Sequence, residues 1–346
     1  MREITYMEAI REATTLEMER DSNVFVYGIG VDDHKEIFGT TAGLVKRFGA
    51  DRCMDTPIAE EAMTGLGLGA AINGLRPIHI HIRVDFMLLA MNQIANMISS
   101  YCYGTGGKRG VPLVIRAIVG RGWGQGFQHS KTMHSTFAHI PGLKVIMPTT
   151  AYDAKGMLIS AIRENNPVII IEHRWLYWQL GDVPEESYTV PLDTGRIIRS
   201  GTDLTVVATS WLNVEALKAA EILSKYGVEL EIIDVRTLSP LDVYLMANSI
   251  AKTGHCIVAD NDWLPYGVSA EIAAEVNEFC FGYLKSPIKR IGFSFTPCPT
   301  ARNLENEFYP NAINIIRAVE SKLGLPPVNL DGEEFYSHEN RFKGPF

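Results

Sequence analysis

The stretch DTPIAEEAMTGLGLG, residues 55–69, places two adjacent carboxylates directly before a segment of small and apolar residues. Glu60 and Glu61 are followed by residues 62–71, which contain no further charge. The apolar spacing predicts a helix over residues 59–73 that packs against other parts of the chain. An acidic residue is therefore expected where the helix begins to be buried. This position makes the acid a candidate functional residue.

Segments with the pattern of buried strands alternate with helical segments along the chain. In the first half, strands are expected at residues 24–30, 77–84, 111–120, 143–148 and 167–173. Short β-branched strands joined by helices indicate an α/β fold in which a parallel sheet is covered on both faces. The alternation restarts after residue 202 and ends with a helix predicted over residues 304–323.

The chain is expected to form two α/β domains, each with a doubly wound sheet. Residues 174–202 are aromatic, acidic and proline-containing, and we interpret them as a connection because no long periodic element fits them. A length of 346 residues suits two domains of ordinary size. The expected boundaries are residues 1–185 and 200–325, followed by a polar tail over residues 326–346.

Composition excludes several classes of function. A net charge of −8 argues against nucleic-acid binding, and the absence of a long apolar run argues against a membrane span. The charged N-terminal segment has no apolar signal core, which favours a cytoplasmic protein. The five cysteines contain no C-x-x-C pair, so neither a disulfide framework nor a zinc site is expected.

Two glycine-rich segments are candidates for ligand binding. GLGLGA, residues 65–70, matches the dinucleotide fingerprint G-x-G-x-x-A, but it lies inside the predicted helix instead of between a strand and a helix. Close helix packing is the favoured interpretation, and a Rossmann oxidoreductase is the alternative. GRGWGQGFQHS, residues 120–130, follows a strand and is interpreted as a substrate or cofactor loop, with a plain long loop as the alternative.

Two histidines lie on one face of a predicted strand. His79 and His81 are two residues apart, so their side chains point to the same side. They could bind a metal, but no third ligand has an obvious spacing. We therefore interpret them as polar residues near a site and predict no metal site in this chain.

The opening stretch and several later segments resemble a known family. DTPIAEEAMTGLGLGAAINGLRPI is similar to the beta subunits of thiamine-diphosphate-dependent 2-oxoacid dehydrogenases, such as pyruvate dehydrogenase. The resemblance continues through QHS (128–130), HIPGLKVIMP (139–148), YDAKGMLISAIRENNPVIIIE (152–172), EIIDVRTLSPLD (231–242) and YGVSAEI (266–272). It implies a transketolase-type pyrimidine-binding domain followed by a transketolase C-terminal-like domain.

The resemblance also implies a cofactor and partners. In this family one chain binds the pyrimidine ring of thiamine diphosphate, and an alpha subunit binds the diphosphate and Mg²⁺ through a G-D-G motif. This sequence contains no G-D-G. The chain should therefore hold half of a cofactor site in an assembly of two alpha and two beta chains, with a lipoyl acyltransferase as a further partner.

Particular residues match the family's site. Glu60 corresponds to the acid that bonds the aminopyrimidine ring and favours the tautomer that takes up the thiazolium proton; the alternative is an acid favoured by the helix dipole. Phe86 corresponds to the aromatic residue against that ring, with a core phenylalanine as the alternative. His129 matches a histidine at the mouth of the site that helps proton transfer, and Ile58 matches a residue beside the cofactor. Glu61, about 100° further around the helix, is expected at the surface.

Other residues depart from the family pattern. Ile29, in GIGVDD (28–33), stands where the dehydrogenases carry an acid. The strand before Phe86 is unusually polar, which predicts a more cationic pocket and makes the following residues candidates for substrate contact: His79, His81, Arg83 and Gln128.

The sequence leaves three candidate functions. The first is a subunit that decarboxylates a 2-oxoacid and transfers the acyl unit. The second is a split transketolase-like subunit that acts on a sugar-type acceptor without lipoyl or oxidation, and the third is a non-catalytic assembly subunit.

Overall fold

The computed structural model describes residues 1–33, 35–120 and 125–335. The chain divides into two compact units, and each is described by itself. The first unit comprises Met1–Gly120 and Thr136–Leu192, and the second comprises Arg121–Ser135 and Asp193–Phe346. The segment that precedes Thr136 therefore groups with the second half of the sequence, although it lies within the first half of the chain.

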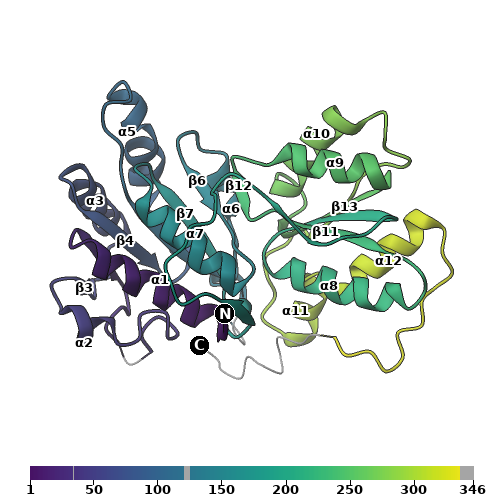
Figure 1. Ribbon diagram of the computed structural model, residues 1–346, viewed down its shortest axis with the longest axis horizontal. Coiled ribbons are helices and arrows are strands. Elements are labelled where there is room, and N and C mark those ends of the chain that lie inside the picture. The colour runs from purple at the N-terminus through teal and green to yellow at the C-terminus, as the bar shows by residue number, and fades with distance from the viewer. Residues whose placement is uncertain (34, 121–124, 336–346) are drawn as a thin grey trace. The chain divides into compact units, whose positions relative to one another are not determined.

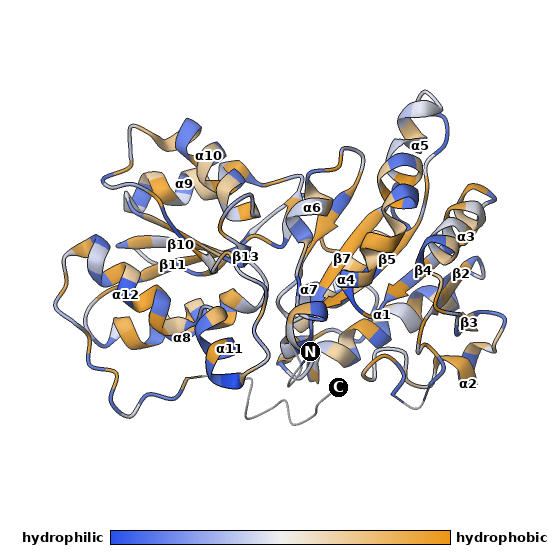
Figure 2. Cartoon of the chain, turned by 180° about the vertical axis from the view of Figure 1, so that it is seen from behind, coloured by the Kyte–Doolittle hydropathy of each residue, from blue (hydrophilic) through white to orange (hydrophobic). Residues whose placement is uncertain are grey.

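A parallel sheet forms the centre of the first unit (Figure 1). Its strands lie in the order β6-β7-β5-β4-β2-β3. They are β2 (Val24–Gly28), β3 (Cys53–Met54), β4 (Arg76–His81), β5 (Val114–Val119), β6 (Lys144–Ile146) and β7 (Val168–His173). Every residue of β2, β5 and β7 is buried, as expected for parallel strands covered on both faces, and Figure 2 shows β5 and β7 as mostly hydrophobic.

Helices cover this sheet, and a short antiparallel pair lies beside it. The pair is β1 (Arg2–Thr5) and β8 (Leu180–Val183). The helices are α1 (Tyr6–Arg20), α2 (Leu44–Phe48), α3 (Glu60–Ile72), α4 (Val84–Met87), α5 (Ser99–Gly104), α6 (His134–Ala138) and α7 (Ala151–Arg163). Single turns of 3-10 helix occupy Leu88–Ala90, Gly126–Gln128 and Arg174–Leu176, and a π-helical segment occupies Asn92–Ile98. A capping box between Thr5 and Glu8 fixes the start of α1.

One glycine of α3, Gly67, serves close helix packing. A Cβ on Gly67 would lie 2.1 Å from the Tyr27 hydroxyl oxygen and 3.3 Å from Leu113. The same Tyr27 hydroxyl donates a 3.0 Å hydrogen bond to the Met63 carbonyl of this helix. The packing interpretation of GLGLGA is confirmed at Gly67, where a glycine lets the helix approach β2.

The second unit has its own sheet, in the order β14-β13-β10-β11-β9. Strand β9 is antiparallel to its neighbour, and the other pairs are parallel. The strands are β9 (Arg196–Arg199), β10 (Leu204–Ala208), β11 (Leu230–Asp234), β13 (Cys256–Trp263) and β14 (Lys289–Phe293). The short strand β12 (Thr237–Ser239) is not part of this sheet. Helices α8 (Trp211–Ser224) and α12 (Ala312–Leu323) pack together on one face, and α9 (Val243–Thr253) and α10 (Val268–Cys280) on the other (Figure 1).

The single helix predicted over residues 304–323 is wrong. The structure has α11 (Arg302–Phe308) and α12, separated by Tyr309, Pro310 and Asn311. Proline lacks the N–H that a continuing helix needs, and the Asn311 side chain caps a new helix by accepting a 2.9 Å hydrogen bond from the Ile313 N–H. No helix among the described residues is long and apolar enough to cross a membrane.

Candidate active site

A small concavity lies in the first unit, where the carboxyl ends of β2 and β4 meet the start of α3. Ligands in parallel α/β sheets bind at this edge. The side chains around it come from distant parts of the sequence: Ile29, Thr56, Pro57, Glu60, Met63, His79, Ile80, His81, Ile82 and Phe86. The structure therefore brings together Glu60, Phe86, Ile29 and the two histidines, all of which the sequence singles out.

Glu60 is the first residue of α3 and is half-buried. Among the described residues, no side chain or backbone group bonds or pairs with its carboxylate. Glu61, one residue on, is exposed and accepts a 3.3 Å hydrogen bond from the Asn92 side chain. The two adjacent acids thus differ: Glu60 faces the concavity without a protein partner, and Glu61 lies at the surface as predicted.

The two histidines form a buried stack beside the concavity. The His79 ring lies parallel to Tyr27, with centroids 4.4 Å apart, and its centroid is 4.1 Å from that of His81. The Thr64 hydroxyl lies 3.4 Å from a ring nitrogen of each. Burial lowers the pKa of His81 to about 4, and burial together with His81 holds the pKa of His79 well below its ordinary value. Both rings are therefore neutral at physiological pH, and they make the site polar without making it cationic.

Arg83 is not among the side chains that line the concavity. It is buried and donates to the carbonyl of Gly120 at the end of β5. Its Nε lies 3.7 Å from a carboxylate oxygen of Asp85. The guanidinium thus connects the start of α4 to the strand after which the glycine-rich loop begins.

The remaining predicted site residues lie elsewhere. Ile58 is 81% exposed and is not among the lining residues. Gln128 is exposed and His129 is half-buried, and both belong to the segment that groups with the second unit. Residues 121–124 of the glycine-rich loop lie outside the described part of the chain.

A second buried histidine cluster, in the second unit, was not predicted as a site. His134 Nε2 lies 2.9 Å from an oxygen of Asp260 and 3.7 Å from one of Asp262, and all three side chains are buried. The Thr209 and Ser135 hydroxyls donate 2.6 Å hydrogen bonds to Asp260 and Asp262, respectively. Burial opposes a charge on His134, but the two carboxylates outweigh it and raise its pKa to about 9.

This cluster is also the one group of potential metal ligands among the residues that the structure describes. His79 and His81 consequently have no third histidine, cysteine or carboxylate ligand there. The sequence offered one signal for the second cluster, the acid-rich D-N-D at the end of β13. Nothing local connects it to His134, which is 126 residues away in the chain.

Comparison with known proteins agrees with this architecture. Residues 2–179 match the model of the transketolase pyrimidine-binding domain, and residues 193–315 match the transketolase C-terminal domain. The class is therefore a transketolase-type pair of α/β domains. A solved split-gene transketolase, in an inactive beta4 tetramer, has the same fold, with a TM-score of 0.74 at 20% identity over 94% of this chain and 99% of that one.

Close relatives define the family more narrowly. The beta subunit of acetoin:2,6-dichlorophenolindophenol oxidoreductase from Cupriavidus necator is 40% identical over 93% of this chain and 98% of its own. The pyruvate dehydrogenase E1 beta subunit from Bos taurus is 36% identical over 93% of this chain and 91% of its own. The chain belongs to the family of E1-type beta subunits, which confirms the predicted family and fold class.

Proposed function

We propose that this chain is the beta subunit of a heteromeric thiamine-diphosphate-dependent enzyme and that Glu60 is its catalytic acid. The observation that carries the proposal is the Glu60 carboxylate, half-buried at a concavity and without a protein partner. Among the residues that line this concavity, Glu60 is the one carboxylate, and the two histidines are neutral. Its carboxyl group is therefore available to a bound group.

The residues present suit the aminopyrimidine half of the cofactor. Phe86 offers a flat aromatic face, Ile29 and Met63 offer apolar contact, and Glu60 offers a proton-sharing group for a ring nitrogen. When bound, thiamine diphosphate supplies a thiazolium carbon that attacks a carbonyl group after losing its proton. Glu60 shares a proton with the pyrimidine ring, and Phe86 orients that ring beside the acid. An alpha subunit holds the diphosphate and Mg²⁺, since this sequence has no G-D-G motif.

We propose a small carbonyl donor for the reaction. The relatives are named for pyruvate and for acetoin, both small uncharged or singly charged carbonyl compounds. The neutral His79 and His81 give the wall of the concavity hydrogen-bonding groups without positive charge. Such a wall favours a 2-oxoacid or hydroxyketone donor over the sugar phosphates that a split transketolase would use.

The remaining roles rest on the family resemblance. His129 assists proton transfer during passage of the acyl unit to a lipoyl acyltransferase, and Ile58, Arg83 and Gln128 stay proposed site residues in the assembled enzyme. Two alpha and two beta chains form the assembly, in the cytoplasm. The predicted domain boundaries, residues 1–185 and 200–325, stay part of this proposal.

Substitution of the two adjacent acids tests the proposal. In the complex reconstituted with the alpha subunit, Glu60→Gln should lower kcat by about 10²-fold or more while thiamine diphosphate still binds, because the loss is that of a proton-sharing group. Glu61→Gln is the matched control and should keep activity close to that of the wild type. Full activity of Glu60→Gln with pyruvate, acetoin or any other donor that the wild type accepts would overturn the assignment.

A further inference from the structure

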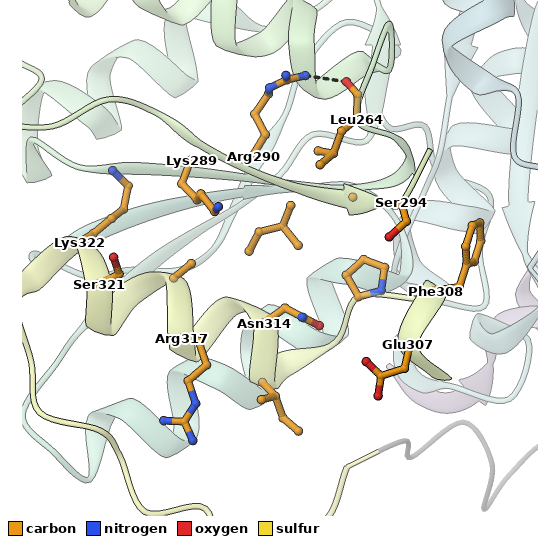
Figure 3. A pocket seen from close by; sticks show the side chains of 15 residues that line it. Leu264, Lys289, Arg290, Ser294, Glu307, Phe308, Asn314, Arg317, Ser321 and Lys322 are labelled. Carbon is orange, nitrogen blue, oxygen red and sulfur yellow. Dashed lines mark hydrogen bonds between the residues drawn. The ribbon is translucent and has the colours of Figure 1, made fainter. Parts of the chain in front are cut away.

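The second unit contains a groove, and the residues that line it lie far in sequence from Glu60. It has a volume of about 480 Å³ and lies between the edge strand β14 and helix α12 (Figure 3). This size falls within the range of small-molecule pockets, about 300–1,000 Å³. Apolar side chains from both elements, from the end of α11 and from the segment that follows it line the groove, among them Ile291, Phe308, Pro310, Ile313 and Ala318.

Positive charges surround these apolar residues. Lys289 and Arg290 stand on β14, and Arg317 and Lys322 stand on α12, whereas Glu307 is the one carboxylate among the lining residues. Arg317 is neutralised by Glu320, 2.6 Å away. In the part of the chain that the structure describes, no carboxylate pairs with Lys289, Arg290 or Lys322. This local excess of positive charge contrasts with the net charge of −8 of the whole chain.

Neutral groups hold two of these cations in place. Lys322 donates to the Ser286 hydroxyl, 2.8 Å away, and to the Pro287 carbonyl, 2.7 Å away. Arg290 donates to the Leu264 carbonyl at 2.7 Å, the dashed line in Figure 3. Lys289 has no hydrogen-bond partner among the described residues. Carbonyls and hydroxyls fix the positions of the ammonium and guanidinium groups but leave their charges uncompensated.

The charges also repel one another. Burial lowers the pKa of Lys322, and the charge of Lys289 lowers it further, against an opposing effect of Cys256. Burial and the charges of Lys322 and Lys285 likewise lower the pKa of His255. An anion placed between these cations would relieve the repulsion, and partial enclosure by apolar side chains would strengthen the attraction.

We propose that this groove binds a small molecule with an anionic head, a phosphate or a carboxylate, held by Lys289 and Lys322, and a short apolar body that packs on Ile291, Ile313 and Ala318. The Ser321 hydroxyl and the Asn314 amide, which also line the groove, provide further hydrogen bonds to the head. The groove shares no lining residue with the concavity at Glu60.

Calorimetric titration of the assembled alpha–beta complex with butyl phosphate, butyrate and inorganic phosphate tests this site. Saturable binding of butyl phosphate or butyrate is expected, with the preferred head identified by the tighter of the two. The apolar body is expected to add affinity, because about 25 cal/mol are gained per Å² of apolar area buried. Inorganic phosphate that binds as tightly as butyl phosphate would overturn the apolar part of the proposal.

Two variants test the cations. Lys289→Gln with Lys322→Gln should weaken binding by tenfold or more, and affinity in the wild type should fall as salt rises. Lys289 is exposed, so Lys289→Gln alone leaves the fold intact and should still weaken binding several-fold. Lys46→Gln with Lys108→Gln, which removes two exposed cations of the first unit, is the matched control and should bind as the wild type does. Absence of saturable binding by the complex, or equal binding by the Lys289 and Lys322 variants, would overturn the proposal.

Discussion

The two units each contain a buried histidine cluster, and the two clusters differ in charge. His81 in the first unit is neutral, whereas His134 in the second unit is protonated. His81 in the first unit and His134 in the second are both buried, yet the pKa of His81 is lowered to about 4 and that of His134 is raised to about 9. The neighbours of His81 are a second imidazole and a hydroxyl, whereas His134 faces two carboxylates. Burial by itself lowers the pKa of a histidine and leaves the ring neutral. Nearby carboxylates raise the pKa and can outweigh the effect of burial.

The difference in histidine charge distinguishes the polar cluster of the first unit from that of the second. In the first unit the neutral rings leave Glu60 as the one acidic side chain that lines the concavity, so it can act on a bound group. In the second unit the charge of His134 is compensated by the buried carboxylates of Asp260 and Asp262. Its contacts, together with a 3.5 Å hydrogen bond from the Tyr309 hydroxyl to the Ser130 carbonyl, attach the segment that carries His129 to the second unit.

Removal of the charged histidine should have the largest effect on stability. His134→Leu leaves two carboxylates buried without their cation, and breaking a buried pair in this way costs about 3–5 kcal/mol. Urea unfolding followed by circular dichroism measures the loss. The exposed His139→Leu is the control and should change stability by less than about 0.5 kcal/mol. A loss below about 1 kcal/mol for His134→Leu would show that the cluster does not depend on this charge.

The pH dependence of stability should show the same contrast with a smaller effect. The folded pKa of His134, about 9, lies above its ordinary value of 6.5, so its contribution is fully present below pH 6.5 and is lost as pH rises to about 9. The urea midpoint should fall over this window in the wild type and fall less in Asp260→Asn, which lacks one of the two carboxylates. A wild-type midpoint that stays flat between pH 6.5 and 9 would contradict a charged His134.

Removal of a neutral histidine should have the smallest effect. His81→Leu deletes one 3.4 Å contact of the Thr64 hydroxyl, which keeps its 3.4 Å contact with His79, so the expected cost is that of one hydrogen bond, about 0.5–1.5 kcal/mol. Because His81 is neutral throughout, the variant should keep the wild-type dependence of stability on pH above 6.5. If His81→Leu costs as much as His134→Leu, or changes that dependence, the two clusters do not differ in charge.

Much of the fold and part of the site could be predicted from local pattern. Alternating strands and helices gave two parallel α/β units, because each element carries its own signal of burial. Ile29, Glu60 and Phe86 follow or begin neighbouring elements, and the carboxyl ends of parallel strands bring such positions together at one edge. The family resemblance then assigned a role to Glu60 that a helix N-terminus alone could not distinguish.

Other features depend on long-range contacts that leave no local pattern. Asp260 and Asp262 lie on a strand more than a hundred residues after His134, and only the folded second unit joins them. The neutrality of His79 and His81 depends on how deeply the fold buries them, so the sequence-based expectation of a more cationic pocket is not met by these two residues. The division of the last helix at Pro310 was readable in principle, since proline followed by a capping asparagine is a local signal.

The role of Glu60 can be measured without a substrate. Deuterium exchange at the thiazolium carbon of thiamine diphosphate, bound to the complex with the alpha subunit, reports directly on removal of that proton. Compared with the wild type, Glu60→Gln should slow the exchange by about 10²-fold or more, and Glu61→Gln should leave it close to the wild-type rate. Exchange at the wild-type rate in Glu60→Gln, with the cofactor fully bound, would contradict the assignment of this acid.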